Sequence, residues 1–163
     1  MHILLNYDKS ILSINENLIK NLIKYLLIDL KFEISKNQII EINILNNSII
    51  REISKKFLQK DHITDVITFD YRPCNFDNEI ISELFISYEI AYIESINNNT
   101  NLSNEIILYI LHGILHMSGF DDDNKINKSK MKREERSIMN KLYNRFDIDN
   151  IIFQIENKDD INR

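Results

Sequence analysis

The stretch HGILHMSGFDDD, residues 112–123, follows a run of apolar residues and ends in three consecutive aspartates. Residues four positions apart lie on the same side of a helix, so His112 and His116 can direct one imidazole nitrogen each toward a common point. Gly119 is suited to end that helix, because glycine adopts the left-handed conformation at little steric cost. The pattern therefore predicts a helix, a turn and an acidic residue that returns toward the two histidines.

The spacing indicates which aspartate completes this arrangement. Zinc enzymes usually bind the metal through three protein ligands and leave a fourth position for water. Position 122 completes a known spacing, in which histidine, histidine at +4 and glycine at +7 precede a third ligand at +10. We therefore predict one zinc ion held by His112, His116 and Asp122. Asp121 and Asp123 are candidate hydrogen-bond acceptors for the ligating imidazoles.

Two other interpretations of this stretch compete with the zinc site. Metzincin proteases use the same spacing but carry a glutamate directly after the first histidine as general base, and here Gly113 stands at that position. Alternatively, the two histidines pack in a core beside a solvated acidic turn. The chain has only two glycines and both lie in this stretch, which favours a functional site. No residue in the sequence is identifiable as the general base, so the catalytic residues stay unassigned.

The apolar pattern predicts the elements around the site. Apolar residues cover more than one face of the segment that begins at Ser103, which predicts a central, largely buried helix capped by that serine. Further helices are predicted over residues 18–30, 48–57, 87–96 and 127–146, and strands over 2–7, 38–46, 64–71 and 80–87. The strand over 64–71 is expected to be central because it is rich in β-branched and aromatic residues. The sequence thus predicts a single-domain α+β fold, in which a mixed sheet of about four strands packs with roughly five helices. The metal site is expected on the central helix and the turn that follows it.

Length and composition indicate one globular domain. The 163 residues are 44% hydrophobic and 28% charged, and they contain no repeat or linker that would divide the chain. We expect a single domain over residues 1–146 and a loosely held C-terminal tail over 147–163.

Charge and apolar run lengths exclude several classes of protein. The net charge of −5 argues against a protein that coats nucleic acid by bulk charge, although a local basic face can still bind phosphates. No apolar run reaches the roughly 18 residues that a membrane helix needs. The N-terminus lacks the pattern of a secretory signal, and Cys74 is the only cysteine. We therefore expect a cytoplasmic protein with no membrane partner.

Three blocks of the chain resemble the YbeY endoribonuclease family. HGILHMSGFDDD is similar to the family signature H-G-x-L-H-L-x-G-[YF]-D-H, and TDVITF at residues 64–69 is similar to its T-D-V-L-S-F. SELFIS at residues 82–87 resembles the strand block G-[DE]-[IL]-x-[IL]-[SC]. The spacings between the blocks also fit, so the resemblance runs from about residue 40 to about residue 145.

The resemblance implies a metal-dependent, single-strand-specific endoribonuclease. Such an enzyme acts in ribosomal RNA processing, at the 3′ end of the small-subunit RNA, and in ribosome quality control, so the implied partners are ribosomal RNA and the small ribosomal subunit. Carried over by position, His112, His116 and residue 122 hold the zinc ion. The family has histidine at the third position where this chain has Asp122. A carboxylate reaches less far and partly neutralises the metal, so bound water should be less acidic.

Basic residues near the signature are the expected RNA contacts. The family carries a basic residue at the position that Leu58 occupies here, and Arg51 or Lys60 can supply that charge instead. Directly after the signature, the segment 125–136 has six basic residues against two acidic ones. We expect its residues Lys125, Lys128, Lys132 and Arg133 to hold the RNA backbone, although a solvated helix face has the same composition. Tyr71 and Phe120 can either stack on bases or pack internally.

Three functions therefore remain open at this level. The leading one is a zinc-dependent endoribonuclease. The first alternative is a non-catalytic ribosome-assembly factor whose altered third ligand weakens its metal site. A metalloprotease-like hydrolase is less favoured because of Gly113, and the sequence does not indicate an oligomeric state.

Overall fold

The structure is a computed structural model that describes residues 1–32, 38–72 and 80–155, so Cys74 lies outside the described residues. In chain order the elements are β1 (His2–Tyr7), β2 (Leu12–Ile14), α1 (Glu16–Asp29), β3 (Ile39–Leu45), α2 (Asn47–Leu58), β4 (Val66–Asp70), β5 (Ile80–Ser87), α3 (Tyr88–Asn97), α4 (Leu102–Met117), α5 (Lys125–Tyr143), the 3-10 helix η1 (Ile148–Asn150) and β6 (Ile152–Gln154). Within the described ranges, five α-helices and a four-stranded sheet confirm the predicted α+β domain. The short strands β2 and β6 were not predicted.

The main sheet has the strand order β1-β3-β5-β4. β1, β3 and β5 run parallel, and β4 pairs antiparallel with β5, so the sheet is mixed as predicted. The prediction of a central strand over 64–71 is wrong, because β4 lies at an edge of the sheet. Helices on the two faces of the sheet cover the apolar and aromatic residues of β4 instead. α4 lies against one face, and Phe57 of α2 packs on Phe69 at the other with ring centroids 5.5 Å apart.

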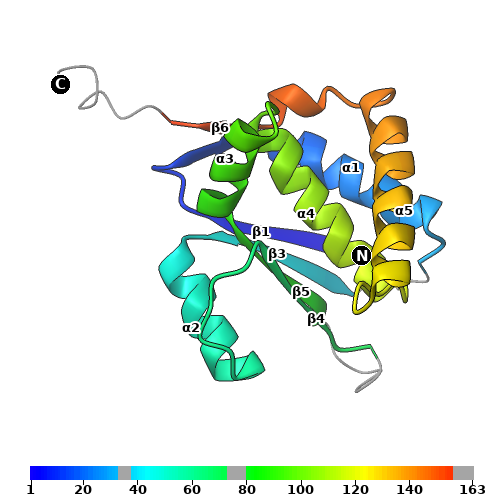
Figure 1. Cartoon of the computed structure of the whole chain (residues 1–163). Helices are drawn as coiled ribbons and strands as arrows, with labels where there is room; N and C mark the ends of the chain where they lie inside the picture. The colour runs from blue at the N-terminus through cyan, green and yellow to red at the C-terminus, as the bar shows by residue number, and fades with distance from the viewer. Residues whose placement is uncertain (33–37, 73–79, 156–163) are drawn as a thin grey trace.

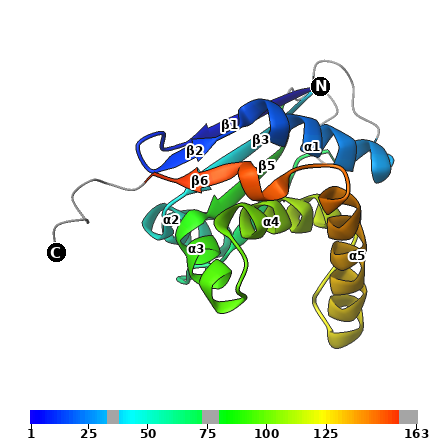
Figure 2. The same ribbon diagram turned by 90° about the horizontal axis from the view of Figure 1, so that it is seen from above.

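The helices form unequal layers on the two faces of the sheet. α1, α3 and α4 lie on one side and α2 lies on the other (Figure 1). Seen from above, α4 runs through the middle of the larger layer, and α5 lies at the C-terminal end of α4 (Figure 2). Nearly every residue of α4 is buried, which confirms the predicted central helix. In the described part of the chain, no helix combines the length and the apolar character needed to cross a membrane.

Gly113 allows α4 to approach the sheet closely. A Cβ atom at this position would lie 2.7 Å from Leu84 Cδ2 and 2.7 Å from Thr68 Oγ1. Those distances are shorter than van der Waals contact, and Leu84 is fully buried, so it cannot move away freely. Only glycine fits between this turn of α4 and strands β4 and β5.

Replacing Gly113 by alanine is expected to destabilise the protein by about 1–3 kcal/mol, because one added methyl group overpacks the junction of α4 and the sheet. Gly119→Ala is the matched control. Gly119 has φ +87° but nothing within 4 Å of a Cβ, so alanine there meets backbone strain without a clash, at a cost of about 1 kcal/mol. Urea unfolding followed by circular dichroism measures both. Equal losses in the two variants would show that packing at Gly113 is not tight.

The segment after α5 differs from the expected tail. Residues 152–154 form β6, which pairs antiparallel with β2, and Ile148, Ile151 and Ile152 are buried. Ser103, predicted as the cap of α4, instead donates its hydroxyl to the Ile148 carbonyl, while Asn101 caps the helix. The packed chain therefore continues past residue 146, because its isoleucines find apolar surface beside α4 and β2. Residues 156–163 lie outside the described ranges.

Candidate metal centre

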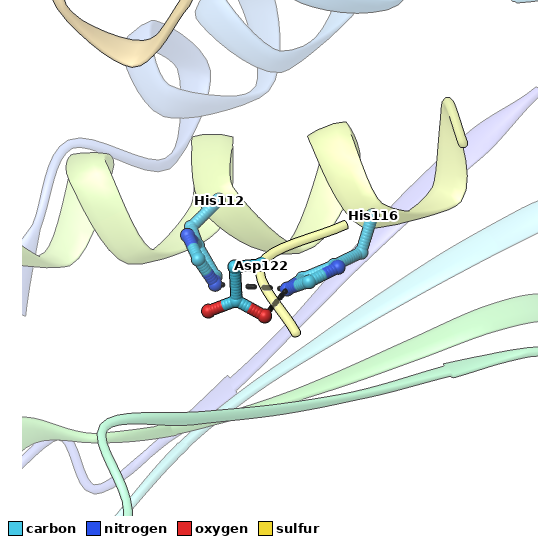
Figure 3. A group of neighbouring side chains, drawn as sticks. All are labelled: His112, His116 and Asp122. Carbon is cyan, nitrogen blue, oxygen red and sulfur yellow. Dashed lines mark hydrogen bonds and ion pairs between the residues drawn. The ribbon is translucent and has the colours of Figure 1, made fainter. Parts of the chain in front are cut away.

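The end of α4 brings the three predicted ligands together. The Gly119 amide donates to the His116 carbonyl at 3.0 Å and the Phe120 amide to the Leu115 carbonyl at 3.1 Å, so the chain turns back on the helix. Gly119 has the positive φ that the sequence predicted. After this turn, the side chain of Asp122 faces His112 and His116, which point toward it from α4 (Figure 3).

The distances between the ligand atoms are close to those of a zinc site. His112 Nε2 lies 2.9 Å from His116 Nε2, and His116 Nε2 lies 3.8 Å from Asp122 Oδ1. One ligand atom from each of the three residues lies within 4.8 Å of the others. Ligand atoms of a tetrahedral zinc ion are about 3.3–3.5 Å apart, given zinc–ligand distances of about 2.0–2.1 Å. Small side-chain rotations therefore suffice for these residues to hold one metal ion.

The other ring nitrogens define which atoms are available to a metal. His116 Nδ1 lies 3.1 Å from the Phe120 carbonyl oxygen, which can only accept, so this nitrogen carries the proton. His112 Nδ1 lies 2.6 Å from Glu135 Oε1 and donates to that carboxylate. In neutral rings, both Nε2 atoms then present lone pairs to each other at 2.9 Å. Two acceptors this close repel unless a cation or a proton lies between them, which fits a metal site.

Negative charge gathers around His112. Burial by itself lowers the pKa of His112, but the hydrogen bond from this ring to Glu135 and the charge of Glu135 raise it. Asp65 and Asp122 add to the effect, and the net result is a pKa above the ordinary histidine value. The surroundings of His112 therefore favour positive charge at its imidazole. A bound metal ion supplies this charge as well as a proton does.

The hydrogen-bond partners of the two candidate ligand rings differ from the predicted ones. Asp121 instead accepts from the backbone amide of Asp122 at 2.7 Å, and Asp123 accepts from the side-chain amides of Asn124 and Asn127. Their places are taken by the Phe120 carbonyl and by Glu135 of α5. No spacing rule could have identified Glu135, because it lies 23 positions after its partner His112 and meets it only through packing of α5 on α4.

The three candidate ligands line a pocket of about 640 Å³. This volume is within the usual range for sites that bind small molecules or parts of larger ones. The pocket lies between α4, α5, β4 and the segment that connects α2 to β4. Its lining consists of Leu58, Lys60, His62, Thr64, Asp65, Val66, Ile67, Thr68, Leu108, Tyr109, His112, His116, Asp122, Lys128, Met131, Lys132 and Glu135.

The predicted RNA contacts divide into two groups. Lys60, Lys128 and Lys132 line the pocket, and the last two lie four residues apart on one face of α5. Arg51, Lys125 and Arg133 are not part of the lining. The Arg51 guanidinium pairs with Asp61 at 2.6 Å on the exposed surface of the protein. Leu58, at the position of the family's basic residue, does line the pocket, so Lys60 is the nearby residue that brings positive charge to this wall.

The two aromatic candidates do not line the pocket. The Tyr71 hydroxyl donates to Glu83 at 2.5 Å, and burial together with this hydrogen bond raises the pKa of Tyr71 to about 12. Phe120 packs against the core. The structure thus places both aromatic side chains in packing positions rather than in the pocket.

A family model and two relatives of this chain carry the same description. A family model described as endoribonuclease YbeY matches residues 4–143. The endoribonuclease YbeY of Clostridioides difficile is 26% identical over 148 residues, which cover 87% of this chain and 97% of that protein. The endoribonuclease YbeY of Azobacteroides pseudotrichonymphae is 37% identical over 116 residues, covering 71% and 78% of the two chains.

A solved structure supports the fold. The solution structure of TM1509 from Thermotoga maritima superposes with a TM-score of 0.55 and covers 88% of this chain and 93% of that one. The two sequences are 23% identical, so this likeness concerns the fold alone.

Proposed function

The chain belongs to the endoribonuclease YbeY family, and on that premise we propose that it is a zinc-dependent endoribonuclease that cleaves single-stranded RNA. The proposed role is ribosomal RNA processing at the 3′ end of the small-subunit RNA and ribosome quality control, in the cytoplasm. The observation that carries the proposal is the cluster of His112, His116 and Asp122 inside a pocket lined by lysines.

The donor set fits zinc. Two imidazole nitrogens and one carboxylate oxygen form a common ligand set of catalytic zinc sites, which leave one position for water. A zinc ion held there supplies Lewis-acid activation of water and of a phosphoryl oxygen. Glu135 and the Phe120 carbonyl hold the protons on the outer ring nitrogens, so that both Nε2 atoms stay directed at the metal position.

The lysines of the pocket explain how an acidic protein can bind RNA. Lys128 and Lys132 approach from α5 and Lys60 from the opposite segment, so positive charge stands on two walls of the pocket. Phosphate groups of a single strand can be held by these ammonium groups while one phosphodiester lies at the metal position. The net charge of −5 is then no obstacle, because the local charge decides binding.

The packing of Gly113 argues against a protease. A metzincin needs a glutamate at this position as general base. Here the position faces Leu84 and Thr68 of the sheet at distances that exclude any side chain. A glutamate at residue 113 would therefore clash with the sheet, and the shared spacing serves another chemistry.

The direct test combines zinc content with cleavage. Inductively coupled plasma mass spectrometry of the purified protein should find about one zinc ion per chain. The protein should cut a labelled single-stranded RNA, leave the same RNA intact when it is base-paired, and lose activity with EDTA until zinc is restored. A protein that binds RNA but neither retains supplied zinc nor cleaves would instead be an assembly factor. Cleavage of casein would favour the hydrolase alternative.

A further inference from the structure

Asp65 lines the pocket and has one carboxylate oxygen without a hydrogen bond to any described residue. This residue directly precedes β4, and its Oδ1 accepts from the Val66 amide at 2.8 Å and from the Thr64 hydroxyl at 2.9 Å. These two bonds hold the carboxylate in place. Its second oxygen makes no hydrogen bond with any described residue, and the side chain is part of the pocket lining.

The other carboxylates of the pocket are already engaged. Three carboxylates line it: Asp65, Asp122 and Glu135. Asp122 belongs to the candidate metal centre, and Glu135 accepts from His112. Asp65 is therefore the one carboxylate of the described lining that neither belongs to the candidate metal centre nor accepts from one of its histidines. A negatively charged acceptor repels phosphates and requires a hydrogen-bond donor.

Tyr109 provides a donor in the same pocket as Asp65. Its side chain is only 7% exposed and lines the same pocket, one turn before His112 on α4. Among the described residues, its hydroxyl has no hydrogen-bond partner. Burial first, and then the charge of Asp65, raise the pKa of Tyr109, so the hydroxyl keeps its proton. Both side chains line the same pocket as the three residues of the candidate metal centre.

We propose that Asp65 and Tyr109 form a ribose subsite, in which the 2′-hydroxyl of a nucleotide next to the scissile phosphate donates to Asp65 and accepts from Tyr109. The inference rests on the proposed function, since it names the part of the RNA that this pocket recognises. A 2′-hydroxyl is both a donor and an acceptor, and it is the group that distinguishes RNA from DNA. The subsite makes the enzyme selective for RNA already at the binding step.

The test compares RNA with the same sequence carrying 2′-fluoro groups. Fluorine keeps the bases, the phosphates and the RNA-like sugar conformation but cannot donate a hydrogen bond. Binding is measured by fluorescence anisotropy, once with zinc supplied and once with EDTA to prevent cleavage. The wild type should bind the 2′-hydroxyl RNA about tenfold more tightly, the size expected for a hydrogen bond to a charged group. In Asp65→Asn this ratio should fall to about two, because the bond loses its charge assistance.

Two further variants separate recognition from general damage. Tyr109→Phe removes only the unpartnered hydroxyl and should lower the ratio in the same direction. Asp61→Asn removes one negative charge from the same segment outside the pocket lining, and it should leave the ratio unchanged. A misfolded variant would weaken binding of both oligonucleotides equally.

Each outcome decides between the two proposals. A wild-type ratio near one, or a ratio that Asp65→Asn does not change, overturns the ribose subsite while RNA cleavage still supports the proposed function. The donor recognised by Asp65 would then be sought on the bases. Absence of both binding and cleavage under all conditions overturns the proposed function and the subsite together.

Discussion

His116→Ala is expected to abolish zinc retention and to slow RNA cleavage by about 10²–10⁴-fold, because metal activation contributes several kcal/mol to the barrier. His116 Nε2 is the central ligand atom, since it is close to both His112 Nε2 and Asp122 Oδ1. Without it only two of the three candidate ligand atoms remain, fewer than zinc enzymes usually use. Asp122→Ala leaves the two imidazoles in place, so it should weaken zinc binding less.

The measurement is zinc content by mass spectrometry after dialysis, together with the cleavage rate of a single-stranded RNA. His62→Ala is the matched control, because His62 lines the same pocket but is not part of the three-ligand cluster. That variant should keep its zinc. If His116→Ala retained one zinc ion per chain, the metal centre assigned here would be wrong, whatever its effect on cleavage.

Glu135→Gln is expected to lower zinc affinity by about 10–100-fold, the usual loss when the partner of a ligating histidine is removed. The amide has the size of the carboxylate, but it accepts a weaker hydrogen bond from His112 and carries no charge. In the metal-free protein, the same change should lower the pKa of His112, because Glu135 is the main cause that raises it. Burial, which lowers the pKa, then acts with less opposition.

Competition with a chromophoric chelator measures the affinity, and an NMR titration of the His112 ring protons follows the pKa. Glu134→Gln is the control, since it removes the same charge from the neighbouring position of α5 and has no hydrogen bond to a ligand in the described structure. Equal zinc affinity in both variants would contradict the positioning role of Glu135. A loss of affinity with an unchanged pKa would show that Glu135 acts through the fold alone.

The candidate metal ligands could be predicted because they lie close together in the chain. His112 and His116 share a helix face through their spacing, and Gly119 reverses the chain because a positive φ suits glycine. Asp122 follows three residues later, so only local geometry had to be known. The numbers of main-sheet strands and of α-helices could also be predicted, because apolar periodicity is a local property of the chain.

Errors arose wherever the answer depended on distant segments. The composition of β4 shows that its faces are covered, but not whether strands flank it on both sides, so the edge position was missed. The isoleucines of 148–152 were assigned to a tail, because their apolar partners on β2 and α4 are remote in sequence. The basic run of α5 could not be divided into pocket-lining and outward residues until the packing of α5 was known.

The sequence alone therefore determined the candidate metal ligands, the turn that joins them and the class of the fold, since helix periodicity and glycine conformation act over a few residues. Only the tertiary structure decided that Glu135 holds His112, that Asp65 and Tyr109 face the same pocket, and that Gly113 is needed for close packing of α4 on the sheet. The physical reason is that burial and hydrogen bonding between remote segments depend on how helices and strands pack, and no local pattern encodes those distances.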